Sequence, residues 1–265
     1  VIRGGTVVAP GGTVRAAVLV RGERIEAVGA VPGVPGLPVV DASGLLVLPG
    51  AIDPHVHFDD SFMNTSSVHN YETGTRAAAF GGVTTVIDFS NQPAGGTLAG
   101  TLEAKFRAAE GHAHIDWGVH PVITDPRPEV LDEIPGIVRA GAPTFKCYMT
   151  YRREGLMVGD ETIRAVLARI AKAGGTLLVH AEDNDVVESG VAALVRAGMT
   201  APIFHARSRP PEAETKAILR LIEAARETRG RIFIVHLASA DGLAAISGAR
   251  AAGVSIAAET CTHYL

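Results

Sequence analysis

The sequence predicts an α/β protein: a TIM-like (β/α)8 barrel in which seven strands are present and the eighth is missing, preceded by a small N-terminal β-sandwich lobe. Three observations support this fold class. Short β-prone runs fill the first part of the chain. From Pro49 onward, apolar runs of strand length alternate with helix-length segments, which is typical of βαβ units in a parallel sheet. The length of 265 residues is also usual for one such barrel.

The predicted lobe consists of four β-prone runs. Turn signals such as Gly4-Gly5 and Pro10-Gly11-Gly12 separate them, and no helical periodicity interrupts them. The runs are Ile2–Val8, Val14–Val20, Arg24–Val28 and Val39–Val47. We therefore expect one domain over residues 1–48 and a second, the incomplete barrel, over residues 49–265.

The predicted barrel alternates strands with helices. The strands are Ala51–His57, Val83–Phe89, Ile115–Ile123, Pro143–Met149, Thr176–Glu182, Arg231–Leu237 and Val254–Thr260. The helices are Tyr71–Phe80, Leu98–Glu110, Glu129–Ala140, Thr162–Ala173, Pro211–Glu227 and Asp241–Ala252. Start and stop signals frame several helices, as Asp160 and Gly174-Gly175 do on either side of Thr162–Ala173.

Composition excludes several classes of function. A formal net charge of −4 without any basic run argues against a nucleic-acid-binding surface. No apolar segment reaches the length that spans a membrane, and the N-terminus lacks the layout of a signal peptide. The cysteines, Cys147 and Cys261, follow neither a disulfide framework nor a zinc-ribbon spacing. We expect a cytoplasmic protein that binds neither nucleic acid nor membranes.

Histidines stand at the ends of three predicted strands. His55 and His57 share a face if they lie on a strand, and paired imidazoles suit a metal such as zinc. His180 and His236 end two later strands. Singly, each has a structural explanation: a turn after Asp53-Pro54 for the first two, or a core histidine bonded to a carbonyl for the others. Because a barrel forms its catalytic face at the C-terminal strand ends, the set predicts a site there.

Lys146 lies inside the apolar run Phe145–Met149. One alternative is a lysine that snorkels to solvent from the strand end. Burial, however, makes an ammonium costly and favours the neutral amine. A neutral amine beside two cations can capture carbon dioxide as a carbamate, whose two oxygens can bridge two metal ions. The adjacent Cys147 is expected to face the opposite side of the strand.

Other polar residues are expected to have structural roles. Asp88 is expected to make an internal polar contact, with support of a metal ligand as the alternative, and His120 to pack inside its strand. His205 is expected to anchor the loop before Ser208-Arg209-Pro210. The remaining histidines are expected at the surface: His69, His112, His114 and His263.

A set of motifs resembles the dihydropyrimidinase and D-hydantoinase branch of the cyclic amidohydrolases. They are Asp53-Pro54-His55-Val56-His57, Gly74–Thr84, Phe145–Tyr151, Val179–Glu182, Ser208-Arg209-Pro210 and Val235–Leu237. The resemblance covers essentially the whole chain. The placement of Tyr151 five positions after Lys146 favours this branch over allantoinase and dihydroorotase.

The resemblance implies a binuclear metal centre. Two divalent ions are expected, zinc first, with manganese or cobalt as alternatives. His55 and His57 would hold the more buried ion, His180 and His236 the more exposed one, and carboxylated Lys146 would bridge both. Tyr151 would donate a hydrogen bond to the substrate carbonyl and to the oxyanion that develops there. Phe62 and Tyr148 would line the pocket for the exocyclic group of the substrate.

The resemblance also implies an activity. It is hydrolysis of the cyclic amide bond of dihydropyrimidines or 5-substituted hydantoins to N-carbamoyl amino acids, by a hydroxide that bridges the metals, in a homotetramer. The family places a catalytic aspartate on an eighth strand. The sequence ends at Leu265, so we expect it to belong to a longer protein. The alternatives are an allantoinase and a non-catalytic, dihydropyrimidinase-like scaffold protein. The filled ligand positions argue against the scaffold.

Overall fold

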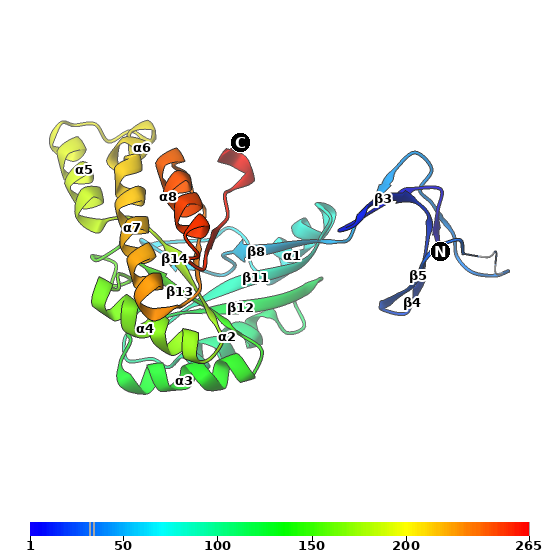
Figure 1. Ribbon diagram of the computed structural model, residues 1–265, viewed down its shortest axis with the longest axis horizontal. Coiled ribbons are helices and arrows are strands. Elements are labelled where there is room, and N and C mark those ends of the chain that lie inside the picture. The colour runs from blue at the N-terminus through cyan, green and yellow to red at the C-terminus, as the bar shows by residue number, and fades with distance from the viewer. Residues whose placement is uncertain (32, 34, 265) are drawn as a thin grey trace.

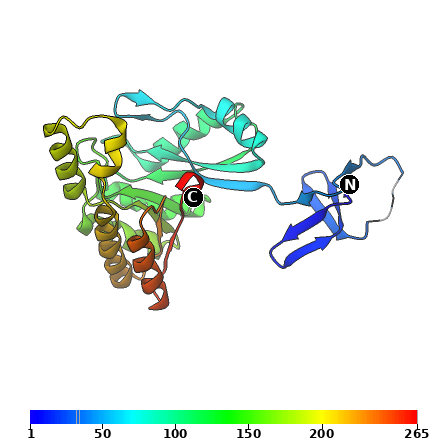
Figure 2. The ribbon, with the colours of Figure 1, turned by 90° about the horizontal axis from the view of Figure 1, so that it is seen from above.

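The computed structural model describes residues 1–31, 33 and 35–264 and shows a curved parallel sheet covered by helices, with a small β lobe beside it (Figure 1). The view from above shows the lobe joined to the sheet by an extended segment that enters strand β8 (Figure 2). The last lobe strand ends at Val47 and β8 begins at Ala51. On that basis we propose residues 1–48 and 49–265 as two domains.

Seven parallel strands form the main sheet in the order β16-β15-β14-β13-β12-β11-β8. Each strand therefore pairs with its neighbour along the chain, which is the winding of a (β/α) barrel. The strands are β8 (Ala51–Val56), β11 (Val83–Asn91), β12 (Asp116–Val122), β13 (Thr144–Tyr148), β14 (Thr176–His180), β15 (Ile232–Ile234) and β16 (Ile256–Ala258). The predicted fold class and all seven predicted strands are confirmed, and β8 and β16 are the edges of the sheet.

Six helices among the described residues cover the outer face of this sheet (Figures 1 and 2). They are α1 (Tyr71–Phe80), α2 (Leu98–Ala109), α3 (Pro128–Arg139), α4 (Asp160–Lys172), α7 (Pro211–Thr228) and α8 (Ala240–Ala251). Helix α5 (Asn184–Arg196) packs on α7 and on the short α6 (His205–Ser208), and 3₁₀ turns lie at Pro202–Phe204 and Thr262–Tyr264. In α4, Ile163, Val166 and Ile170 form the buried stripe that helical spacing predicts. No helix among the described residues is long and apolar enough to cross a membrane.

Alternation along the strands separates the core from the site. In β13, Phe145 and Cys147 are fully buried in the core between sheet and helices. Lys146 and Tyr148 lie between them in sequence and therefore face the other side of the sheet, where Tyr148 packs with Phe89. The predicted placement of Cys147 on the face opposite Lys146 is confirmed. This two-residue period is what aims the lysine into the barrel.

The N-terminal lobe consists of two small sheets, with strand orders β5-β4-β1-β6 and β3-β2-β7. Its strands are β1 (Ile2–Arg3), β2 (Thr6–Ala9), β3 (Gly12–Arg15), β4 (Ala17–Arg21), β5 (Arg24–Gly29), β6 (Val40–Asp41) and β7 (Leu46–Val47). Three of the four predicted runs each split into two strands that lie in different sheets. The first splits at Gly4, whose φ of +82° and close approach to Ser43 exclude a side chain.

Two elements differ from the sequence-based expectation. Helix α5 was not predicted, because its apolar residues do not form one clear stripe. Val191 and Val195, for example, lie on its exposed face. Its N-cap is nevertheless readable, since the Asp183 side chain accepts a hydrogen bond from the Val186 amide. The antiparallel hairpin β9 (Ser61–Phe62) and β10 (Thr65–Ser66) was also not predicted, because two-residue strands give no periodic signal.

Candidate metal centre

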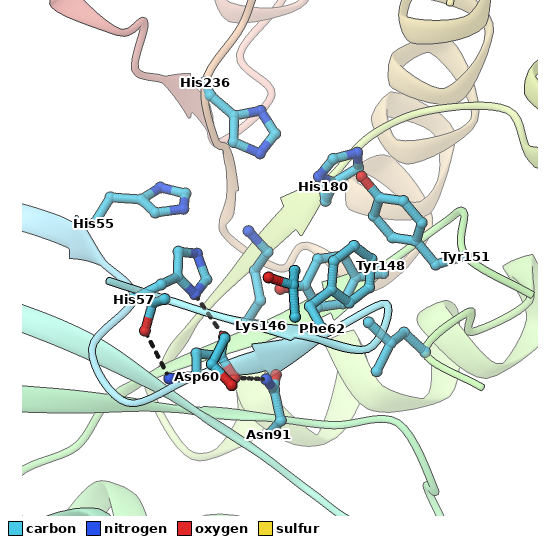
Figure 3. A pocket seen from close by; sticks show the side chains of 14 residues that line it. His55, His57, Asp60, Phe62, Asn91, Lys146, Tyr148, Tyr151, His180 and His236 are labelled. Carbon is cyan, nitrogen blue, oxygen red and sulfur yellow. Dashed lines mark hydrogen bonds and ion pairs between the residues drawn. The ribbon is translucent and has the colours of Figure 1, made fainter. Parts of the chain in front are cut away.

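One cavity of about 440 Å³ at the C-terminal ends of the strands contains all eight predicted site residues (Figure 3). They are His55, His57, Phe62, Lys146, Tyr148, Tyr151, His180 and His236. Six further residues complete the lining: Asp60, Thr65, Ser66, Ser67, Asn91 and Leu156. Residues separated by most of the barrel sequence thus converge on one space, as expected for the catalytic face of this fold.

The four histidines form a cluster at this end of the sheet. His55 is in β8, His180 is the last residue of β14, and His57 and His236 lie just beyond their strands. Ring centroids are 5.4 Å apart for His55 and His57, 4.6 Å for His180 and His236, and 5.4 Å for His55 and His236. The chain reaches His236 through a left-handed backbone conformation, with φ of 40°, which is unusual for a residue with a side chain.

A carboxylate engages one ring nitrogen of each of three histidines. The pairs are His55 Nδ1 with Glu259 Oε1 at 2.6 Å, His57 Nδ1 with Asp60 Oδ2 at 3.1 Å, and His180 Nε2 with Glu182 Oε2 at 2.6 Å. A carboxylate accepts a hydrogen bond, so the engaged nitrogen carries the proton and the opposite nitrogen keeps its lone pair. This is the arrangement of histidines that bind a metal.

Burial keeps several of these imidazoles neutral. It is the main cause that lowers the pKa of His55 and of His180, against the opposing effect of the hydrogen bonds that these rings donate to their carboxylate partners. The pKa of His236 is lowered to about 2, by burial first and then by the charges of His180, Lys146 and His55. Only a neutral imidazole can donate electrons to a metal ion. These three rings are therefore in the required state at neutral pH.

Lys146 lies at the floor of the cavity with 1% of its surface exposed. Its Nζ is 4.9 Å from the ring centre of Phe89 and 5.0 Å from that of Tyr148. Burial lowers the pKa of this amine to about 7, against an opposing effect of Glu259. A substantial fraction is therefore neutral at physiological pH, and the neutral amine is the form that reacts with carbon dioxide.

The donor set consists of four histidines and one buried lysine. Within the described part of the chain, no three His, Cys, Asp or Glu side chains come close enough together to hold an ion by themselves. If Lys146 were carboxylated, the two oxygens of its carbamate would add to the histidine nitrogens, and the residues present would then fit two metal ions.

Tyr151 lies beside His180 in the cavity, with their ring centroids 5.2 Å apart (Figure 3). Its ring centroid is 5.0 Å from that of Phe62 and 5.9 Å from that of Tyr148. The backbone of Tyr151 has a left-handed conformation, with φ of 67°. Asn184 supports this conformation, because its side-chain oxygen accepts a hydrogen bond of 3.3 Å from the backbone amide of the next residue, Arg152. Burial raises the pKa of Tyr151, so its hydroxyl remains a proton donor at neutral pH.

The structure also places the polar residues that were expected outside the site. Asp88 is fully buried and pairs with Lys105 at 2.8 Å. His120 is buried and uses both ring nitrogens, with Thr144 Oγ1 at 2.6 Å and the carbonyl of Pro54 at 3.1 Å. His69, His112, His114 and His263 are exposed, as predicted. His205 begins α6, and its carbonyl accepts a hydrogen bond from Ser208.

The residues that the sequence-based prediction missed are polar partners of the site. Asp60, Glu182 and Glu259 engage the histidines, and Asn91 at the end of β11 donates to Asp60. Glu182 had a local signal, because it follows His180 by two residues at a strand end. Glu259 stands 204 positions from His55, so no local pattern links them.

Comparisons with known proteins show the family to which this chain is related. The sequence profile of the amidohydrolase family matches residues 46–200. A D-hydantoinase from Ralstonia pickettii is 37% identical over 265 residues, which covers 100% of this chain and 58% of the relative. A D-phenylhydantoinase from Escherichia coli K12 is 37% identical over 267 residues, which covers 100% of this chain and 57% of the relative.

The crystal structure of dihydropyrimidinase from Brevibacillus agri NCHU1002 superposes with a TM-score of 0.96 at 38% identity, covering 100% of this chain and 57% of that one. The chain thus spans 57–58% of the length of these relatives.

Proposed function

Because this chain belongs to the amidohydrolase family, we propose that the protein hydrolyses a cyclic amide bond, that of a 5-substituted hydantoin or of a dihydropyrimidine. Water adds to the ring carbonyl carbon, the ring C–N bond breaks, and the ring nitrogen takes a proton, which yields an N-carbamoyl amino acid. Relatives with the names D-hydantoinase, D-phenylhydantoinase and dihydropyrimidinase support this substrate class.

The observation that carries the proposal is the convergence of four histidines and one buried lysine on a single cavity. His55 with His57 would hold one divalent ion, His180 with His236 a second, and Lys146, as a carbamate, would bridge them. Zinc is the first candidate, because imidazole suits it, with manganese or cobalt as alternatives. When bound, such a pair of ions acidifies a water molecule and polarises a carbonyl.

Tyr151 is proposed to act on the substrate carbonyl. Its protonated hydroxyl can donate a hydrogen bond to the carbonyl oxygen, and that bond strengthens as the oxygen gains negative charge in the transition state. The aromatic rings of Phe62 and Tyr148 lie against Tyr151, on the side of the cavity away from His55. They are proposed to contact the exocyclic substituent of the ring, because apolar side chains can bind an apolar substituent without forming hydrogen bonds to the ring amide.

The family resemblance further supports a homotetramer in the cytoplasm, which we also propose. Light scattering on the purified protein tests the assembly, and a mass of one or two chains would contradict it.

The function is tested with purified protein, a 5-substituted hydantoin, dihydrouracil and allantoin, together with a measurement of bound metal. We expect ring opening of the first two substrates and close to two ions per chain. Lys146→Ala should lose activity and bridging, and a short carboxylic acid added to the buffer should restore part of the activity. Lys172→Ala, at the exposed end of α4, is the matched control and should behave as wild type.

Three results would contradict the proposal. Faster turnover of allantoin than of the other rings would indicate an allantoinase. A protein that binds no metal and opens none of these rings would be a scaffold. Undiminished activity of Lys146→Ala would exclude the carbamate role of that residue.

A further inference from the structure

We propose that Asp60 is a positioning residue, which holds the His57 imidazole by Nδ1 so that Nε2 faces the cavity, and which ties that ring to the β9–β10 hairpin. This inference rests on the metal-dependent function proposed above. It concerns a residue three positions after the His-Val-His motif, outside the set of metal ligands.

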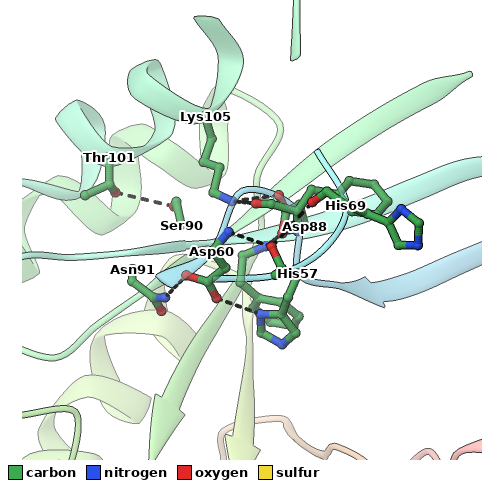
Figure 4. A network of polar contacts seen from close by, with 11 residues as sticks. His57, Asp60, His69, Asp88, Ser90, Asn91, Thr101 and Lys105 are labelled. Atoms are coloured by element: carbon green, nitrogen blue, oxygen red, sulfur yellow. Dashed lines mark hydrogen bonds and ion pairs between the residues drawn. The ribbon is translucent and has the colours of Figure 1, made fainter. Parts of the chain in front are cut away.

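Asp60 is held in place from several directions (Figure 4). Its Oδ2 lies 3.1 Å from His57 Nδ1, and its Oδ1 accepts a hydrogen bond of 2.9 Å from Asn91 Nδ2. Its backbone amide donates to Ser67 Oγ at 2.9 Å. Each carboxylate oxygen thus has its own donor, and the side chain is 17% exposed. A carboxylate with both oxygens engaged has one orientation, so it can fix the ring that it contacts.

The backbone next to His57 is fixed independently, from the opposite side. The Phe58 amide donates to Asp88 Oδ1 at 3.3 Å, and its carbonyl accepts a hydrogen bond from Lys105. Lys105 and the buried Asp88 pair at 2.8 Å. With the main chain held in this way, the remaining freedom of His57 is rotation of its side chain. Imidazole torsions are broad and nearly two-fold, so a specific partner is required to select one ring orientation.

Asp60 also closes the loop that carries the aromatic wall. Its carbonyl accepts a hydrogen bond of 2.8 Å from the Ser67 amide, which joins the two ends of the β9–β10 hairpin. Phe62 lies within this hairpin and packs edge-on against Tyr151. The side chain of Asp60 therefore faces the metal ligand while its backbone holds the substrate wall. A shift of one would displace the other.

Replacement of Asp60 should weaken metal binding in a graded manner. Partners behind metal-binding histidines typically change metal affinity by about 10-fold to 100-fold. Asp60→Ala removes the hydrogen bond and should weaken binding of one ion by about that factor. Asp60→Asn keeps an oxygen that can accept from Nδ1 but loses the charge, so it should recover part of the affinity. Asp59→Asn is the matched control, because Asp59 is exposed and the carboxylate that engages His57 Nδ1 is that of Asp60.

The measurement is metal affinity by competition with a chelator, with zinc as the probe, on wild type and the three variants. Two further variants, His57→Ala and His57→Ala/Asp60→Ala, test whether Asp60 acts through His57. If Asp60 acts through His57, the double variant should bind zinc as weakly as His57→Ala alone. Ser67→Ala removes the acceptor of the Asp60 amide, so it should raise KM for a bulky 5-substituted hydantoin and lower zinc affinity by less than Asp60→Ala does.

The outcomes separate this inference from the proposed function. Wild-type protein that binds no zinc would overturn both. Two ions in wild type, with unchanged affinity in Asp60→Ala, would overturn the inference alone. Complete loss of one ion in Asp60→Ala, far beyond a hundredfold, would show that Asp60 is itself a ligand and would overturn the positioning role. A graded loss that disappears in the His57→Ala background supports it.

Discussion

Lys146→Met should stabilise the metal-free protein while it removes the proposed activity. The ammonium of Lys146 is buried, and burial lowers its pKa from the ordinary value of 10.5 to about 7. At about 1.4 kcal/mol per pKa unit, this gap corresponds to a cost of up to about 5 kcal/mol for the folded state. Methionine has nearly the same length and no charge, so it should avoid most of that cost. A functional group that destabilises its own fold is a known form of trade-off between activity and stability.

The sign of the pH dependence follows from proton linkage. Between pH 7 and pH 10.5 the unfolded chain keeps the proton on Lys146 while the folded chain has released it. The unfolded state therefore binds more protons, and wild-type stability rises with pH across this window. The advantage of Lys146→Met should be greatest at pH 7 and below, and should decline as pH approaches 10.5.

The assay is urea unfolding of metal-free protein in buffer without carbon dioxide, at pH 6 and at pH 9.5, for wild type and Lys146→Met. Lys172→Met, which changes an exposed lysine, should alter stability by less than about 0.5 kcal/mol at both pH values. A Lys146→Met protein that is no more stable than wild type at pH 6 would refute the reasoning. An advantage of equal size at both pH values would attribute the gain to packing and not to the buried charge.

Two other substitutions separate chemistry from structure. Tyr151→Phe should lower kcat by about 10²-fold to 10³-fold, because the oxyanion loses one donor, while bound metal stays unchanged; equal kcat values would exclude the proposed role of the hydroxyl. His120→Leu should destabilise the fold by about 1–3 kcal/mol, since Thr144 and the Pro54 carbonyl lose their partner, and should leave the metal content as it was. Burial lowers the pKa of His120 from 6.5 to about 4, so wild-type stability should fall as pH drops through that window, and denaturation at pH 4.5 should show a smaller loss in the variant than in wild type.

Periodicity explains why much of the fold could be predicted. Strands buried on both faces leave long apolar runs, and helices leave stripes such as Ile163, Val166 and Ile170. The same period of two residues predicts that Lys146 lies on one face of its strand and Cys147 on the other. Elements without a periodic pattern of apolar residues could not be predicted from the sequence. Helix α5 exposes valines, and the β9–β10 hairpin has only two residues in each strand.

The sequence by itself determined which residues could carry the chemistry, because imidazoles and a lysine at the ends of apolar strands must lie at one end of a parallel sheet. Only the tertiary structure decided how they are held. Glu259 reaches His55 across 204 positions, and Asn91 reaches Asp60 across 31. Contacts of this kind depend on where separate strands end and on which loop folds over them. A hydrogen bond between side chains requires positions set within a few tenths of an ångström, and local sequence patterns specify a face but not such a position.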